Sequence, residues 1–328
     1  MKNDRVLSYI VFDGDWGRVV DLSAEERRVL SKNYYGTEDV LPFYLEYLEG
    51  SLRSLAATCW SRCPQVRVWL IPIEGKLRPE TLRARLTAAA PGLALDIVSV
   101  DSSFALPFIG HVLLLPENCR APNNLHEAAM FLALRDSPER FVFFADPDLT
   151  FIALGAFDRF VDRLAANPGK LAAGFIEPAW CDPNGFAFRE RLHTVACAFD
   201  AEAMRREFPI QLFTEPTPPH VRNVLLKDDL AALEYYRQGG KCDSLSLFTD
   251  WARALGQPDR ILNMNGMMDC YAERSYLTLV CEDMVHCKYL SPFAAKPLEE
   301  AIAAAGVPST PLLEFVRAKA RQSSGCTQ

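Results

Sequence analysis

Two carboxylates on either side of a proline form the part of the sequence best suited to chemistry. Residues 141–145 read FVFFA, and Asp146, Pro147 and Asp148 follow them. An apolar run without alternation is typical of a strand buried on both faces, and Pro147, which has no backbone N–H, should end it. Both carboxylates could then turn toward one ion, and two hard oxygen ligands suit Mg²⁺ or Mn²⁺. Asp and Pro are also ordinary turn residues, so the stretch alone equally fits a strand that simply ends there.

The surrounding sequence predicts an alternation of strands and helices. Strands are expected at 6–12, 66–73, 93–100, from 141 to the carboxylates, 170–176, 193–199 and 277–280, and helices at 38–60, 79–90, 125–135, 155–166, 201–207, 228–240, 297–305 and 312–321. This order is typical of a doubly wound α/β fold with a mostly parallel central sheet flanked by helices, and of a helical tail at the C-terminal end. In such sheets ligands bind outside the carboxyl ends of the strands.

Two polar positions lie where that edge is expected. Asp13 follows the first strand within DGDWG, a composition that fits a nucleotide-binding loop or an ordinary turn. Asn123 or Asn124 should cap the helix that begins near residue 125, and the helix N-terminus could face a phosphate or a ribose.

Composition limits the class of protein. The 328 residues are 49% hydrophobic and 23% charged, which suits a globular chain with ample core. The net charge of −7 disfavours a nucleic-acid partner. The N-terminal apolar run is too short for a signal peptide, and no apolar run is long enough to span a membrane. The ten cysteines are scattered and form no CxxC pair, which is typical of buried thiols in a cytoplasmic protein. The oligomeric state stays open.

The order of these features resembles the GT-A glycosyltransferases, the nucleotide-diphosphosugar transferases. In that family a strand-terminal D-x-D holds a divalent metal on the donor diphosphate. The resemblance implies that Asp148 ligates the metal directly and that Asp146 ligates it or reaches the ribose or a metal-bound water. It also implies that Asp13 and Asn124, which matches an asparagine that often opens the equivalent helix in family-2 members, contact the nucleotide.

Further motifs resemble those of two different subfamilies. Asp228 and Asp229, followed by Gly240, resemble the acidic pair of inverting family-2 enzymes, whose second member is the catalytic base; helix capping explains the pair as well. His286 resembles the histidine that completes the metal shell after a late strand, although a packed histidine is the plain alternative. Lys288 and Lys296, the latter followed by a proline, resemble the diphosphate-closing residues of retaining family-8 enzymes, at a longer spacing than usual and without the glycine that follows the family's histidine.

The resemblance runs from about residue 6 to 297 and predicts a GT-A domain at 1–296 with a helical extension at 297–328. It implies a Mn²⁺- or Mg²⁺-dependent hexosyltransferase that uses a UDP-sugar and an acceptor that is a glycan, a small molecule or a peptide. A metal-dependent nucleotidyltransferase or phosphohydrolase is the first alternative, but residues 12–19 offer only Gly14, Gly17 and Arg18 for a phosphate loop. A non-catalytic Rossmann-like binding protein is the second alternative.

Overall fold

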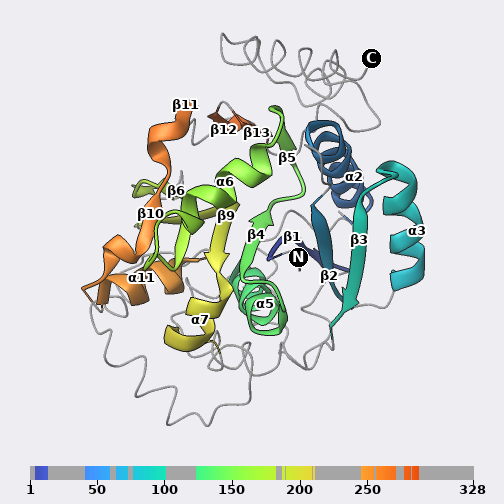
Figure 1. The fold of residues 1–328 in the computed structure, drawn as a ribbon. Helices are drawn as coiled ribbons and strands as arrows, with labels where there is room; N and C mark the ends of the chain where they lie inside the picture. Colours follow the sequence, from blue (N-terminus) through green and yellow to red (C-terminus); the bar gives the residue numbers. More distant parts are fainter. Residues whose placement is uncertain are drawn as a thin grey trace.

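A seven-stranded sheet forms the centre of the protein (Figure 1). The computed structural model describes residues 4–13, 41–59, 64–72, 77–100, 123–181, 187–188, 190–208, 210, 245–254, 256–270, 277–281 and 283–287. The acidic pair Asp228 and Asp229, the two lysines Lys288 and Lys296, and the extension 297–328 lie outside these ranges.

Strand order in the central sheet is β10-β6-β9-β4-β1-β2-β3. Its members are β1 (Arg5–Phe12), β2 (Gln65–Ile71), β3 (Ala94–Ser99), β4 (Phe141–Ala145), β6 (Ala172–Glu177), β9 (Arg191–Asp200) and β10 (Ile261–Asn263). Strand β9 pairs antiparallel with both β4 and β6, and the other pairings are parallel. The sheet is therefore mostly parallel, as predicted, and the first residues of β9 lie at the edge where β4 ends.

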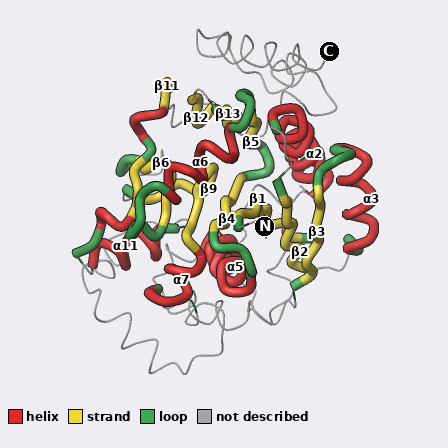
Figure 2. Tube along the Cα trace, in the orientation of Figure 1, coloured by secondary structure: helices red, strands yellow, loops and turns green. Residues whose placement is uncertain are grey.

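Helices cover both faces of this sheet (Figure 2). They are α2 (Leu41–Thr58), α3 (Pro79–Ala89), α5 (Asn123–Asp136), α6 (Ala156–Ala165), α7 (Ala201–Glu207) and α11 (Ser246–Ala254). Alternate side chains of β4 enter opposite layers: Phe141 and Phe143 pack in the cluster that contains α2, α3 and α6, while Val142 and Phe144 pack in the cluster that contains α5, α7 and α11. Successive side chains of β4 are therefore buried on alternate faces of the sheet, which explains why its apolar run is uninterrupted.

A smaller antiparallel sheet lies beside the carboxyl end of β4. Its strand order is β11-β12-β13-β5, with β5 at Leu149–Phe151, β11 at Met268–Cys270, β12 at Leu277–Cys281 and β13 at Met284–Cys287. Strand β5 begins directly after Asp148, so the two carboxylates lie in the segment that connects the central sheet to the small sheet. Short pieces complete the described fold: the hairpin of β7 (Trp180–Cys181) and β8 (Ala187–Phe188), and two 3₁₀ turns at Pro258–Arg260 and Asn265–Met267.

Most predicted elements of the central sheet are confirmed within one or two residues at each end. Helix α7 matches its predicted bounds, and α5 begins at Asn123 rather than near residue 125, so both asparagines lie in its first turn instead of before it. The sequence analysis did not anticipate α11 or the short strands β5, β7, β8, β10, β11 and β13. Among the described residues, no helix is both long and apolar enough to cross a membrane.

Candidate metal centre

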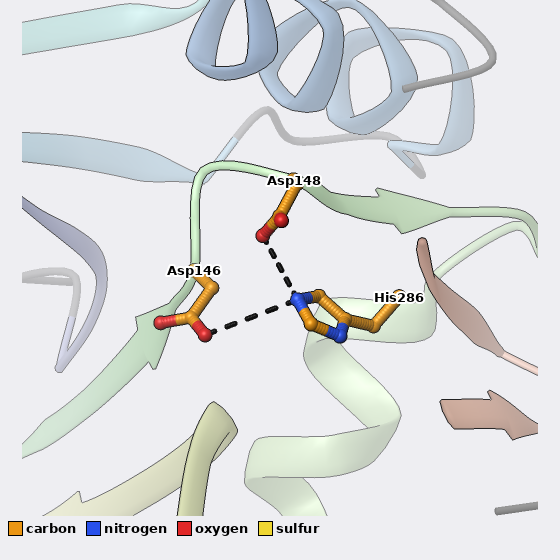
Figure 3. A group of neighbouring side chains, drawn as sticks. All are labelled: Asp146, Asp148 and His286. Carbon is orange, nitrogen blue, oxygen red and sulfur yellow. Dashed lines mark hydrogen bonds and ion pairs between the residues drawn. The ribbon is translucent and has the colours of Figure 1, made fainter. Parts of the chain in front are cut away.

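Asp146 and Asp148 are brought to one side by a tight turn. The backbone N–H of Leu149 donates to the Asp146 carbonyl at 3.0 Å, which closes the turn over Pro147 immediately after β4. The N–H of Asp146 donates to the Val195 carbonyl of β9 at 3.1 Å. Because the chain leaves the extended conformation at this point, the two side chains are released from the alternation of a strand and reach the same space (Figure 3).

His286 reaches this space through strand pairing. Strand β13 runs antiparallel to β5, and His286 is the partner of Leu149, the residue that follows Asp148. The pairing continues at Val285 with Thr150. Register between two short strands therefore places the imidazole beside the carboxylates, although Asp148 and His286 are 138 positions apart.

The three side chains form a compact group with the chemistry of a metal site. His286 Nε2 lies 2.9 Å from Asp148 Oδ1 and 3.9 Å from Asp146 Oδ2, and one ligand atom from each residue lies within 4.8 Å of the others. Ligand atoms bound at 2.0–2.1 Å in an octahedral shell lie about 2.9 Å apart when adjacent and about 4.2 Å apart when opposite. The two distances from His286, 2.9 Å and 3.9 Å, fit this range, so two carboxylates and one imidazole could share a single ion.

Burial distinguishes the three side chains. The exposed fraction is 24% for Asp146, 13% for Asp148 and 4% for His286. The imidazole is therefore the most buried of the three groups, and Asp146 is the most accessible to a ligand from solvent.

The negative charges of Asp146 and Asp148 contribute to raised pKa values of two neighbouring groups. Burial, and then the Asp146 carboxylate, raise the pKa of the Cys197 thiol well above its usual value. On α2, burial followed by the charge of Asp148 raises the pKa of the Tyr47 phenol. These shifts indicate that Cys197 and Tyr47 lie within electrostatic range of the two carboxylates.

A second histidine lies next to the group, and sequence reasoning missed it. The His193 ring packs edge-on against the His286 ring, with 6.4 Å between centroids. The Val195 N–H donates to His193 Nδ1 at 3.0 Å, and a neutral His193 ring consequently carries its proton on Nε2. In the sequence His193 was only the first residue of a predicted strand. The antiparallel direction of β9, which places its first residues at this edge, has no local signal.

Asp13 is at the expected edge but is already engaged. It follows β1, the parallel neighbour of β4, and is fully buried. Its Oδ2 accepts a hydrogen bond from the Leu77 N–H at 2.8 Å, and its own N–H donates to the Ile71 carbonyl. One carboxylate oxygen of Asp13 thus holds the segment that follows β2. Asn124 lies in the first turn of α5, and its side chain lies outside the described part of the structure.

Further buried ionisable side chains lie on α5, β6 and β9. Arg191 and Glu177 form an ion pair at 2.6 Å, each with a side chain 6% exposed. Glu127 of α5 is fully buried and accepts from the Phe248 N–H at 3.1 Å. Its Oε2 atom makes no hydrogen bond within the described residues. Burial is the main reason that the pKa of Glu127 is raised to about 8.

Comparison with known proteins identifies the architecture. Neither a scan against protein-family models nor a search of curated protein sequences found a match. Among solved structures, the galactosyltransferase LgtC in complex with donor and acceptor sugar analogs matches over 96% of this chain and 99% of its own, at 12% identity and a TM-score of 0.50. The chain has the GT-A fold. The resemblance drawn from the sequence is thereby confirmed at the level of fold, and the choice between family 2 and family 8 stays open.

Two other GT-A structures are similar at lower scores. Mouse xyloside xylosyltransferase 1, in its apo form, matches over 81% of this chain and 86% of its own, with 12% identity and a TM-score of 0.45. The mannosyltransferase PcManGT from Pyrobaculum calidifontis, in complex with GDP-Man and Mn²⁺, matches over 98% of this chain and 84% of its own, with 13% identity and a TM-score of 0.35. The assignment of the fold rests on LgtC.

Proposed function

We propose that this GT-A protein is a metal-dependent glycosyltransferase that moves a sugar from a nucleoside diphosphate sugar, with a UDP-sugar as the first choice, to an acceptor. The observation that carries the proposal is the Asp146, Asp148 and His286 group at the carboxyl end of β4. Ligands of open α/β sheets bind at this edge, and the group has the donor atoms and spacing for one divalent cation.

Asp148 and His286 would hold the ion most directly, because they are the more buried members and already lie 2.9 Å apart. Asp146 would complete the protein side of the shell or contact a bound water. Mg²⁺ accepts the two carboxylates, and the imidazole shifts the preference toward Mn²⁺. A bound divalent cation would stabilise the negative charge that develops on a diphosphate leaving group.

The residues of the chain have separate tasks in this proposal. The β4 turn and the β5–β13 pairing hold the ligand atoms in place before the donor arrives, which lowers the cost of organising them on binding. Asp13 and Asn124 would contact the nucleotide, and Lys288 and Lys296 would contact its diphosphate, as the sequence resemblance implies.

Asp229 would take the proton of the attacking acceptor hydroxyl, with Asp228 beside it. A carboxylate within hydrogen-bond reach of that hydroxyl suffices for this step. This assignment is supported by the acidic pair in the sequence and predicts inversion at the anomeric carbon.

Thermal unfolding with Mn²⁺ and UDP tests the proposal without knowledge of the acceptor. A ligand that binds only the folded state stabilises it by about 2.7 kcal/mol at a concentration one hundred times its Kd. We expect a rise in Tm with Mn²⁺ and UDP together that exceeds the sum of the rises with each alone, and loss of this excess in Asp148→Ala. GDP, ADP and CDP in parallel identify the base. If none of these nucleotides raises Tm in the presence of Mn²⁺ or Mg²⁺, the proposal is wrong.

A further inference from the structure

Strand β5, which carries the chain away from the metal centre, is held along both edges. One edge pairs with β13. On the other edge, the N–H of Phe151 donates to the Ser54 hydroxyl of α2 at 3.0 Å, in a buried contact. The Ser54 hydroxyl in turn donates to the Ser51 carbonyl at 2.7 Å. The hydroxyl proton of Ser54 is used in this bond, so the oxygen acts toward β5 as an acceptor.

A second contact one helical turn later keeps the two segments parallel. The Gly155 N–H, four residues after Phe151, donates to the carbonyl of Thr58, four residues after Ser54, at 2.7 Å. The Thr58 hydroxyl donates back to the Ser54 carbonyl at 2.8 Å. Helix α2 therefore lies alongside the chain from β5 to the start of α6, as Figure 1 shows.

The position of β5 determines the geometry of the proposed metal centre. Asp148 directly precedes β5, and His286 is paired with Leu149, the first residue of β5. Three residues make a very short strand, so the pairing with β13 alone supplies few hydrogen bonds. A shift of β5 away from α2 would move Asp148 relative to His286.

We propose that Ser54 is a positioning residue of the metal centre, which it serves by fixing β5 through the Phe151 N–H. This inference rests on the metal site of the proposed function. The Ser54 hydroxyl makes its hydrogen bonds with Ser51 and Phe151 rather than with the aspartates or His286, and its removal would leave the Phe151 N–H buried without this acceptor. The strand would then relax toward another partner, and the preformed spacing of the ligand atoms would be lost.

The matched control is Tyr9, whose hydroxyl forms a 2.7 Å buried hydrogen bond with the Ser51 hydroxyl on the preceding turn of the same helix. Tyr9→Phe removes a buried hydrogen bond from α2 and does not remove the hydrogen bond between the Phe151 N–H and Ser54. Both Ser54→Ala and Tyr9→Phe should lower Tm in EDTA by similar amounts. A purely structural role of Ser54 would give the two variants the same behaviour in every assay.

The readout is the Kd for Mn²⁺ alone, from the electron paramagnetic resonance signal of the free ion. Hydrogen bonds made directly to metal ligands typically change metal affinity about 10- to 100-fold, and Ser54 acts one step further away, through β5, so its effect should lie near the lower end of this range. We expect Ser54→Ala to raise Kd about tenfold and Tyr9→Phe to leave it within about twofold of the wild type. Should Ser54→Ala not fold, Ser54→Cys keeps the shape of the side chain with a slightly larger and much weaker acceptor, and the same comparison applies.

The outcomes separate the two claims. Equal Mn²⁺ affinities for the wild type, Ser54→Ala and Tyr9→Phe would overturn the role of Ser54 and leave the metal centre intact. Equal losses in the two variants would also overturn it, because the effect would then follow helix stability. Failure of the wild type to bind Mn²⁺ would overturn the metal centre itself, and the positioning role with it.

Discussion

The wild type should lose stability as pH rises from about 5 to about 8, because of Glu127. Replacing Glu127 by glutamine should abolish this dependence. Glu127 is fully buried on α5. Burial raises the pKa of its carboxyl group to about 8, against smaller opposing effects of the Phe248 N–H and the Arg191 charge. The folded protein therefore keeps a proton on Glu127 over a range in which the unfolded chain has released it.

The sign and size follow from proton linkage. Below pH 4.5, the ordinary pKa of the group, both states are protonated and the full stability is present. As pH rises toward the folded pKa, the stability falls by about 1.4 kcal/mol per pH unit for one proton. Over a window from 4.5 to about 8, the loss amounts to roughly 4 to 5 kcal/mol. Glutamine stays neutral throughout and should show none of it.

Urea denaturation of the wild type and Glu127→Gln at several pH values from 5 to 8 measures this effect. Other titrating groups contribute equally to both proteins, so the difference between their unfolding free energies isolates Glu127. The variant should gain several kcal/mol relative to the wild type between the two ends of the range. Glu202→Gln, at an exposed glutamate of α7, is the control and should follow the wild type. Parallel curves for Glu127→Gln and the wild type would refute the assignment of a protonated Glu127.

Three further predictions concern the site and the core. His286→Ala should weaken Mn²⁺-dependent UDP binding at least tenfold in calorimetry, because an imidazole ligand is lost; unchanged affinity with lowered stability would make it a packed histidine. Asp229→Asn should lower kcat by about a hundredfold to ten-thousandfold with UDP affinity nearly unchanged, and the wild-type product should be inverted at the anomeric carbon; retention seen by NMR would contradict this base. Glu139→Ala should lower the free energy of unfolding by about 1 to 3 kcal/mol in denaturant unfolding, because Arg67, 6% exposed and bound to Glu139 at 2.6 Å, would keep only the 42% exposed Asp96 as an ionic partner; the double variant Arg67→Met, Glu139→Leu should recover most of the loss, and equal losses in both proteins would count against that explanation.

The central sheet could be predicted because its signals are local. The apolar run of β4, the proline at the first turn of α3 and the polar break at Asp146 each depend on a few neighbouring residues. The two carboxylates were predicted to converge for the same reason, since Pro147 ends the strand between them.

The rest of the site depends on contacts that a local pattern does not contain. His286 was recognised by resemblance, but its pairing with Leu149 follows from the register of two short strands far apart in sequence. His193 joins the site because β9 runs antiparallel to β4. The contact of Ser54 with Phe151 joins a helix and a strand 97 positions apart, and a serine within an amphipathic helix carries no signal of that role.

Crystals grown with Mn²⁺ and UDP test the metal centre most directly, through an anomalous difference map at the manganese edge. The account predicts one strong peak within about 2.3 Å of Asp148 and His286 ligand atoms, with the 2.9 Å hydrogen bond between Asp148 Oδ1 and His286 Nε2 replaced by two bonds to the ion and with diphosphate oxygens in the remaining positions. A map in which Asp148 and His286 remain hydrogen-bonded to each other, with manganese and UDP bound elsewhere or absent at saturating concentrations, would contradict it.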